Sequence, residues 1–311
     1  MNDSASISII ISTANRPQML WFAVESVVNQ SCRPTELVIV DDASREPLPM
    51  SDIADACQRV GIKLTAERNS ESQGPSACRN QGVRLAGNSV VGFLDDDDMF
   101  LPHHVSTHMA LFERTASACL VTSGICAGDW HGEAPRAFFA SNRINGLISG
   151  RDLLFANLVG APSNVTMFRE VFLLAGGFDE TIPALEDYEF WLRIAQDHEL
   201  LGTSEVTVRY NLTLAGKTSR TTRNATARDD AQKEIRRRYG AKYSTLSTVE
   251  RRRAFANLVF ISHGPYANMS LLYRIRLVFR VVTWWPLVKA MSLLVAPRVR
   301  LMVKALVSRG C

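Results

Sequence analysis

The sequence predicts an α/β fold, in which a sheet of largely parallel strands is flanked by helices and followed by a helical C-terminal appendage. Short apolar runs that end in polar residues alternate with longer segments of helical spacing through the first third of the chain. The 311 residues are 46% apolar and 21% charged, a globular composition that excludes a disordered or low-complexity chain. Residues 251–311 contain eleven Lys and Arg residues and no Asp or Glu. The chain therefore has an acidic body and a basic tail.

Four strands and three helices are expected to alternate in the first hundred residues. The expected strands are residues 6–12, 36–40, 63–66 and 90–94, and the expected helices are residues 17–29, 51–60 and 75–86. In the first helix, Pro17 suits the first turn, and Leu20 and Val24 lie at helical spacing. Sheets with right-handed crossovers bind ligands beyond the carboxyl ends of their strands, so polar residues there are candidates for function.

The rest of the chain gives weaker signals. Strands are expected at residues 118–123, 165–168 and 206–210, and helices at residues 151–157, 186–196 and 224–261. The segment 216–223 is polar, basic and rich in Thr and Ser, which predicts a mobile loop. Six cysteines without metal-like spacing are expected to be free thiols in a reducing compartment.

Two carboxylates, Asp41 and Asp42, directly follow the apolar run 38–40. At the end of a buried strand such a carboxylate can accept hydrogen bonds from a base or a ribose. Asp and Ser residues also form turns before helices, so a structural role for this pair stays open.

Four carboxylates, Asp95 to Asp98, follow the apolar run 90–94. Adjacent carboxylates repel one another unless a cation or protons neutralise them. Alternate residues of an extended chain point the same way, so Asp95 and Asp97 could hold one Mg²⁺ or Mn²⁺ ion while Asp96 faces elsewhere. An acidic loop tip without a metal is the alternative.

Three histidines, at positions 103, 104 and 108, follow the aspartates. His104 and His108 are one helical turn apart, the spacing of a metal-binding pair. No H-E-x-x-H pattern accompanies them, so we expect them on a helix face with hydrogen-bonding roles.

Glu186 and Asp187 begin a segment of helical spacing. The helix dipole favours carboxylates in a first turn, which is a sufficient structural explanation. A carboxylate held rigidly at a helix start could also act as a general base. The preceding turn, residues 175–180, could border an acceptor site.

Several segments, taken in order, resemble the inverting family 2 glycosyltransferases. They are SIIISTANRP (8–17), VVNQ (27–30), ELVIVDDAS (36–44), GPSACRNQG (74–82), VVGFLDDDD (90–98), GGFDE (176–180) and LEDYEFWLRIA (185–195). The resemblance covers about residues 5–220. It implies the GT-A fold, a Rossmann-like nucleotide-binding mixed sheet flanked by helices.

The resemblance also implies roles for individual residues. The implied nucleotide contacts are Asn15, Arg16, Asp41 or Asp42, Arg79, Asp95 and Asp96. The implied ligands of a divalent metal, Mn²⁺ or Mg²⁺, are Asp95 and Asp97, although Asp98 fits the pattern as well. Asp187 is the implied catalytic base, with Glu186 beside it. The segment that resembles a closure over the diphosphate contains Arg209, Lys217 and Ser219.

By this resemblance, the chain is expected to move a sugar, with inversion, from a nucleotide-diphosphate sugar to a hydroxyl of a glycan or lipid-linked acceptor in cell-surface polysaccharide biosynthesis. The expected domains are a GT-A domain (1–223), with a nucleotide-sugar part (1–115) and an acceptor part (116–223), and a helical region (224–311). A metal-dependent nucleotidyltransferase and a non-catalytic, membrane-associated scaffold remain open as alternatives. A dinucleotide-dependent oxidoreductase is disfavoured, since no G-x-G-x-x-G follows the first strand.

The basic tail suggests contact with a membrane surface. Residues 270–311 alternate aliphatic clusters with cations, and Trp284 and Trp285 suit the lipid headgroup region. A helical appendage packed against the body is the alternative, and nucleic acid is not expected because the tail is strongly aliphatic. No apolar run is long enough to span a bilayer, and the first residues do not resemble a signal peptide. We therefore expect a cytoplasmic protein, peripheral on the inner face of the cell membrane.

Overall fold

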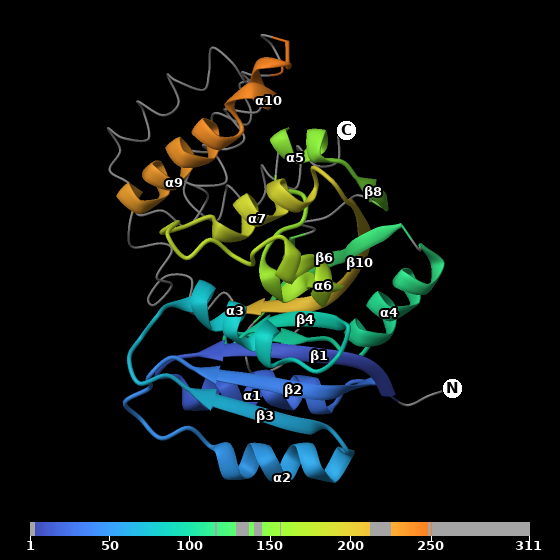
Figure 1. The fold of residues 1–311 in the computed structure, drawn as a ribbon. Helices are drawn as coiled ribbons and strands as arrows, with labels where there is room; N and C mark the ends of the chain where they lie inside the picture. The colour runs from blue at the N-terminus through green and yellow to red at the C-terminus, as the bar shows by residue number, and fades with distance from the viewer. Residues whose placement is uncertain are drawn as a thin grey trace. The chain divides into compact units, whose positions relative to one another are not determined.

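The structure is a computed structural model that describes residues 4–115, 117–128, 137–139, 145–155, 157–211, 225–247 and 250. The chain divides into two compact units. The first comprises residues 1–150, 158–181 and 186–213, and the second comprises residues 151–157, 182–185 and 214–311. All the strands described below belong to the first unit. Figure 1 shows the helices and strands as a ribbon coloured by residue number.

Ten strands of the described residues form one mixed sheet. They are β1 (Ser4–Thr13), β2 (Arg33–Asp41), β3 (Lys63–Arg68), β4 (Val90–Asp95), β5 (Asp98–Phe100), β6 (Ala118–Gly128), β7 (Ala137–Phe139), β8 (Gly146–Ile148), β9 (Val165–Phe168) and β10 (Glu199–Asn211). Their order is β3-β2-β1-β4-β9-β6-β10-β5, with β7 beside β6 and β8 beside β10.

The first half of the sheet is parallel, as predicted. Strands β1 to β4 run in the same direction and extend the four expected strands by up to three residues at either end. The predicted helices are confirmed as α1 (Pro17–Val28), α2 (Met50–Val60) and α3 (Pro75–Leu85).

Helices α1 and α3 cover opposite faces of this parallel half. Ile9 and Ile11 of β1 lie in one core cluster with Leu20 of α1. Ile10 instead packs against Gly82 of α3, so closely that a Cβ at position 82 would clash with the Ile10 side chain. Successive side chains of a strand point to opposite faces, so the alternation separates the two helices. Because both faces are covered, Ile7 to Ile11 read as a continuous buried run.

The second half of the sheet is mixed. Strand β9 coincides with the strand expected at 165–168, and β6 begins where a strand was expected at 118–123. The short strands β5, β7 and β8 and the short helix α6 were not predicted. Strand β9 is antiparallel to β4 and β6, and β5 is antiparallel to β10. The expected strand at 206–210 is only the end of the longer β10. The helices of this part of the first unit are α4 (His104–Arg114), the 3₁₀ turn η1 (Pro162–Asn164), α6 (Arg169–Leu174) and α7 (Glu186–Ile194). The helix expected at 151–157 is confirmed as α5 (Gly150–Phe155), which, apart from Gly150, belongs to the second unit.

The acidic segment joins two distant parts of the sheet. Strand β4 ends at Asp95 in the middle of the sheet, and β5 begins at Asp98 and pairs with β10 at the other edge. The turn between them is therefore held from both sides, which fixes its carboxylates.

The second unit contains the helices α9 (Ala225–Arg238) and α10 (Gly240–Ser244), in agreement with the predicted helical segment that starts at 224. Ile182, Ala184 and Ala231 form a small buried cluster there. In the described part of the chain, no helix combines the length and the apolar character that crossing a bilayer requires. The tail, residues 251–311, lies outside the described residues.

Candidate functional site

Three carboxylates of the acidic turn converge. One oxygen each from Asp95, Asp97 and Asp98 lies within 4.8 Å of the others. Asp98 is 1% exposed, and its Oδ1 atom has no hydrogen-bond partner among the described residues. A buried carboxylate that has an oxygen without a hydrogen-bond partner and lies beside two further carboxylates suits a hard divalent cation such as Mg²⁺ or Mn²⁺. The residues present therefore fit the implied metal.

The proton affinities of this cluster reflect its crowding. Burial, followed by the charges of Asp95 and Asp96, raises the pKa of Asp97 to about 6. Burial and the charges of Asp97 and Asp95 likewise raise the pKa of Asp98 well above its ordinary value. Like charges in a desolvated turn are costly, and a bound divalent cation would remove that cost.

Asp96 faces the end of β1 instead. It accepts hydrogen bonds from Thr13 Oγ1 and from Arg16 Nη1, both at 2.8 Å. Arg16 also reaches Asp97 Oδ2 at 2.9 Å. This guanidinium therefore connects the start of α1 with the acidic turn and partly offsets its negative charge.

The residues expected to contact a nucleotide meet at the carboxyl ends of β1, β2 and β4. Thr13 is in register with Asp41, and Ser12 is in register with Asp95. Asn15, with φ +58°, accepts a hydrogen bond from the backbone N–H of Arg45 at 2.7 Å. The loops after β1 and β2 are therefore tied together at this edge.

Asp41 and Asp42 have different surroundings. Asp42 accepts hydrogen bonds from Ser72, Gln73 and Gly74, at 2.7, 2.6 and 3.0 Å. Burial alone would raise the pKa of Asp42, but these donors hold it below its ordinary value. Asp41 accepts the backbone N–H of Ser44 at 2.9 Å. Arg68 Nε also lies 3.6 Å from Asp41 Oδ2. Asp42 thus holds the loop before α3, whereas Asp41 holds the start of the loop that follows β2.

Arg79 of α3 bridges the acidic turn and the start of α7. Its buried guanidinium contacts Asp95 Oδ1 at 2.5 Å and Glu186 Oε1 at 3.4 Å. These carboxylates outweigh the effect of burial and raise the pKa of Arg79, so it stays charged. The residue is 7% exposed. Arg79 therefore links two groups of carboxylates that are far apart in the sequence.

Asp187 lies at the start of α7, beside Glu186. Burial, followed by the charge of Glu186, raises the pKa of Asp187 to about 7. The Asp187 Oδ1 atom accepts the backbone N–H of Tyr188 at 2.7 Å. A carboxyl group with this pKa can both take up and release a proton near neutral pH, as a general base must.

Helix α7 is firmly anchored below this carboxyl group. Trp191 is fully buried and donates its Nε1–H to the carbonyl of Gly160 at 3.0 Å. Phe178 and Phe190 pack against it, with ring centroids 5.9 and 5.3 Å away. The start of the helix is therefore supported by a rigid aromatic cluster.

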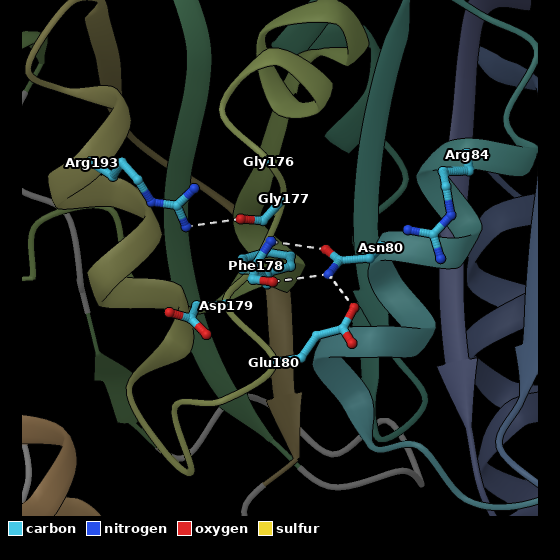
Figure 2. A pocket seen from close by; sticks show the side chains of 8 residues that line it. All are labelled: Asn80, Arg84, Gly176, Gly177, Phe178, Asp179, Glu180 and Arg193. Atoms are coloured by element: carbon cyan, nitrogen blue, oxygen red, sulfur yellow. Dashed lines mark hydrogen bonds between the residues drawn. The ribbon is translucent and has the colours of Figure 1, made fainter.

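A polar pocket of about 410 Å³ lies between α3 and the connection from α6 to α7 (Figure 2). Its lining residues are Asn80, Arg84, Gly176, Gly177, Phe178, Asp179, Glu180 and Arg193. Asn80 donates to the carbonyl of Phe178 at 2.9 Å and to Glu180 Oε1 at 2.8 Å. Asn80 directly follows Arg79, so this pocket and the acidic site share helix α3.

The remaining predicted residues fall into two groups. Arg209 lies in β10 opposite Met99 of β5, next to the acidic turn. Lys217 and Ser219 lie outside the described residues, as does the whole of the expected mobile loop, 216–223. The structure brings the other expected site residues together around the ends of β1, β2 and β4 and the start of α7.

Two of the three predicted histidines are core residues, and the third, His103, has a side chain that is 42% exposed. His104 and His108 are fully buried on α4, and their Nδ1 atoms are hydrogen bonded to Thr207 at 2.8 Å and Thr166 at 2.9 Å. The prediction of hydrogen-bonding roles is confirmed, but both rings face the sheet. Burial lowers the pKa of His108 to about 3, so the ring is neutral.

A profile described as "Glycosyl transferase family 2" matches residues 8–173. The chain belongs to this family. A relative described as an uncharacterized glycosyltransferase from Haemophilus influenzae is 28% identical over 200 residues, which is 61% of this chain and 62% of the relative. The chain thus covers less than two thirds of that relative. The putative colanic acid biosynthesis glycosyl transferase WcaA of Escherichia coli is 25% identical over 201 residues, 64% of this chain and 69% of WcaA.

Solved structures share the fold of this family member. The structure of S. aureus TarS 1–349 in complex with UDP-GlcNAc has a TM-score of 0.62 at 14% identity and covers 98% of this chain and 92% of that one. The mannosyltransferase PcManGT from Pyrobaculum calidifontis, in complex with GDP-Man and Mn²⁺, has a TM-score of 0.58 at 14% identity and covers 96% and 86%. The predicted GT-A fold is therefore confirmed.

Proposed function

We propose that this family 2 glycosyltransferase is inverting and moves a sugar from a nucleotide-diphosphate sugar to a hydroxyl of a glycan or lipid-linked acceptor. The observation that carries the proposal is Asp187, a half-buried carboxyl with a pKa of about 7, whose neighbour Glu186 is linked through Arg79 to the acidic turn. The name of the relative WcaA supports a role in cell-surface polysaccharide biosynthesis.

In this proposal Asp187 is the catalytic base, and Glu186 tunes it. An acceptor hydroxyl is a poor nucleophile at neutral pH, so Asp187 takes its proton as the oxygen attacks the anomeric carbon. Attack opposite the leaving diphosphate inverts the configuration at that carbon. The charge of Glu186 keeps the proton affinity of Asp187 high, and Arg79 neutralises Glu186 in part.

Asp95 and Asp97 are the proposed ligands of the divalent cation, Mn²⁺ or Mg²⁺, and we propose the Asp98 carboxylate as a further ligand because it lies in the same group of oxygens. The cation, when bound, stabilises the negative charge that develops on the departing diphosphate. Arg16 and Arg79 assist by holding Asp97 and Asp95 in place.

The donor nucleotide is proposed to bind at the carboxyl ends of β1, β2 and β4. The proposed contacts are Asn15, Arg16, Asp41 or Asp42, Arg79, Asp95 and Asp96. Arg209, with Lys217 and Ser219 of the basic segment after β10, is proposed to meet the diphosphate. The acceptor is proposed to bind next to the turn formed by residues 175–180.

We further propose that residues 1–223 are the catalytic domain, with a nucleotide-sugar part (1–115) and an acceptor part (116–223). Residues 224–311 are proposed as a basic region, whose segment 270–311 contacts the inner face of the cell membrane. The support is the composition of that segment, with its cations, aliphatic residues and paired Trp284 and Trp285.

The variant Asp187→Asn tests the base. It removes the proton acceptor and keeps the size of the side chain, so sugar transfer should fall at least about 100-fold while nucleotide binding stays unchanged. Transfer is measured with a panel of nucleotide sugars, and binding by calorimetry. The control is Asp197→Asn, which changes an exposed aspartate just beyond the other end of α7 and should keep full transfer. Full transfer by Asp187→Asn would exclude this residue as the base.

A further inference from the structure

A serine from a distant part of the chain contacts both ends of the acidic turn. Ser163 Oγ accepts the backbone N–H of Asp95 at 3.0 Å and donates to Asp98 Oδ2 at 2.5 Å. A hydroxyl group has one donor and two acceptor positions, so it can make both bonds at once. The turn from Asp95 to Asp98 is thereby closed by a side chain that belongs to neither β4 nor β5.

Ser163 is itself held in place by burial and by the hydrogen bonds of its neighbour Asn164. It lies in η1 and is fully buried. Its neighbour Asn164 donates to Thr122 Oγ1 at 2.7 Å, to the carbonyl of Ser123 at 3.1 Å and to the carbonyl of Val159 at 2.6 Å. These bonds fix η1 to β6, in the middle of the sheet.

The contact with Ser163 determines which oxygen of Asp98 stays free. Oδ2 is bonded to Ser163, and the backbone N–H of Asn211 is also hydrogen bonded to the Asp98 carboxylate. Oδ1 has no partner among the described residues, and one oxygen of the Asp98 carboxylate lies within 4.8 Å of an oxygen each of Asp95 and Asp97. Because Oδ2 is bonded to Ser163, Oδ1 is the oxygen left for a cation. Without the hydroxyl, the carboxylate could rotate and withdraw Oδ1 from this group.

We propose that Ser163 is a positioning residue of the cation site, which holds Asp98 Oδ1 and the Asp95 backbone in the geometry that binds the metal. The inference rests on the proposed function, because it requires a cation at this turn. Removal of a group that orients a metal ligand by a hydrogen bond commonly lowers the metal affinity about 10- to 100-fold.

The test measures Mn²⁺ binding to the full chain without nucleotide. Binding is detected as the loss of the electron paramagnetic resonance signal of free Mn²⁺. We expect Ser163→Ala to weaken the Mn²⁺ affinity at least about tenfold. Ser163→Cys, which keeps a small side chain but has only a weak donor, serves as the second variant and should also lose affinity. Thermal unfolding without Mn²⁺ verifies that each variant is folded.

Ser123→Ala is the matched control, because Ser123 is equally buried and its hydroxyl bonds only to Thr207 Oγ1, at 2.6 Å, among the described contacts. It should bind Mn²⁺ as the wild type does. Wild-type affinity in folded Ser163 variants, or an equal loss in Ser123→Ala, would overturn the positioning role and leave the cation site standing. Failure of the wild type to bind Mn²⁺ would instead overturn the cation site of the proposed function, and the positioning role with it.

Discussion

Asp187 shows how single residues set the chemistry of this site. Its pKa of about 7 comes from burial first and from the charge of Glu186 second, while Arg79 acts in the opposite direction. The base must be deprotonated to accept a proton from the acceptor, so its pKa fixes the lower pH limit of the reaction.

The pH profile of transfer tests this assignment. Transfer should decline as the pH falls below about 7, because Asp187 becomes protonated. In Glu186→Gln the repulsion from the neighbouring charge is absent, so the pKa of Asp187 falls and the decline moves to lower pH by about one unit. Rates measured from pH 5 to pH 9 show both effects, and Glu199→Gln, at an exposed position, is the control. A decline at the same pH in wild type and Glu186→Gln would contradict the role of this pair.

At the residue scale, the sequence could indicate which side chains carry the chemistry but not how they are held. Asp95, Asp97 and Asp187 stand out because carboxylates follow an apolar strand or begin a helix. Ser163 gives no such signal, since its bonds join residues 65 or more positions apart and follow no local pattern. The Ser163 contact determines which oxygen of Asp98 has no hydrogen-bond partner. The sequence does not reveal this contact, so it could not decide which of the four aspartates bind the metal.

At the scale of elements, the backbone of the turn between α6 and α7 is constrained at two glycines. Gly176 and Gly177 have φ angles of +84° and +72°, which side chains with a Cβ rarely adopt. A Cβ on Gly177 would lie 2.5 Å from Asn80 Oδ1. Asn80 has little freedom to yield, because it is bonded to Phe178 and Glu180.

Gly177→Ala and Gly61→Ala separate backbone strain from the clash. Gly61 has φ +75° and open space around it, so Gly61→Ala should cost about 1–2 kcal/mol of unfolding free energy from strain alone. Gly177→Ala adds the overlap with Asn80, which we expect to cost about 1–3 kcal/mol more. Denaturant unfolding of both variants measures the difference. Equal losses would show that the turn is not fixed by Asn80.

Most of the elements that could be predicted have enough residues to show a period, and β9 and α5 are short exceptions. Strands β1 to β4 and helices α1 to α3 have long apolar runs or repeated helical spacing. Strands β5 and β8 have three residues each, and α6 has six, too few for a period. The first part of β10 contains Gly202, Thr203, Ser204 and Glu205. These residues interrupt the apolar pattern by which a strand is recognised in a sequence.

At the scale of the whole molecule, charge is distributed unevenly. The formal net charge is +4, yet residues 251–311 contain eleven basic and no acidic residues, so the rest of the chain is acidic. A basic, aliphatic segment with tryptophans is suited to an anionic lipid surface.

Truncation tests the membrane proposal. A chain that ends at residue 269 should lose binding to vesicles that contain phosphatidylglycerol, while the full chain should sediment with them. Binding of the full chain should weaken at high salt, because part of the attraction is electrostatic. Vesicles of phosphatidylcholine alone are the control. Equal sedimentation of the two chains would exclude residues 270–311 as the contact.

The central claim is that the acidic turn binds a nucleotide diphosphate through a divalent cation. Calorimetry with UDP, GDP and dTDP, and with CMP as a ligand without a diphosphate, is carried out in Mn²⁺ and in EDTA on wild type, Asp97→Ala and the control Asp197→Ala. We expect one diphosphate to bind wild type and control in Mn²⁺ and to lose binding in EDTA and in Asp97→Ala. Equal binding by wild type and Asp97→Ala, or no binding of any nucleotide to the wild type, would contradict the account.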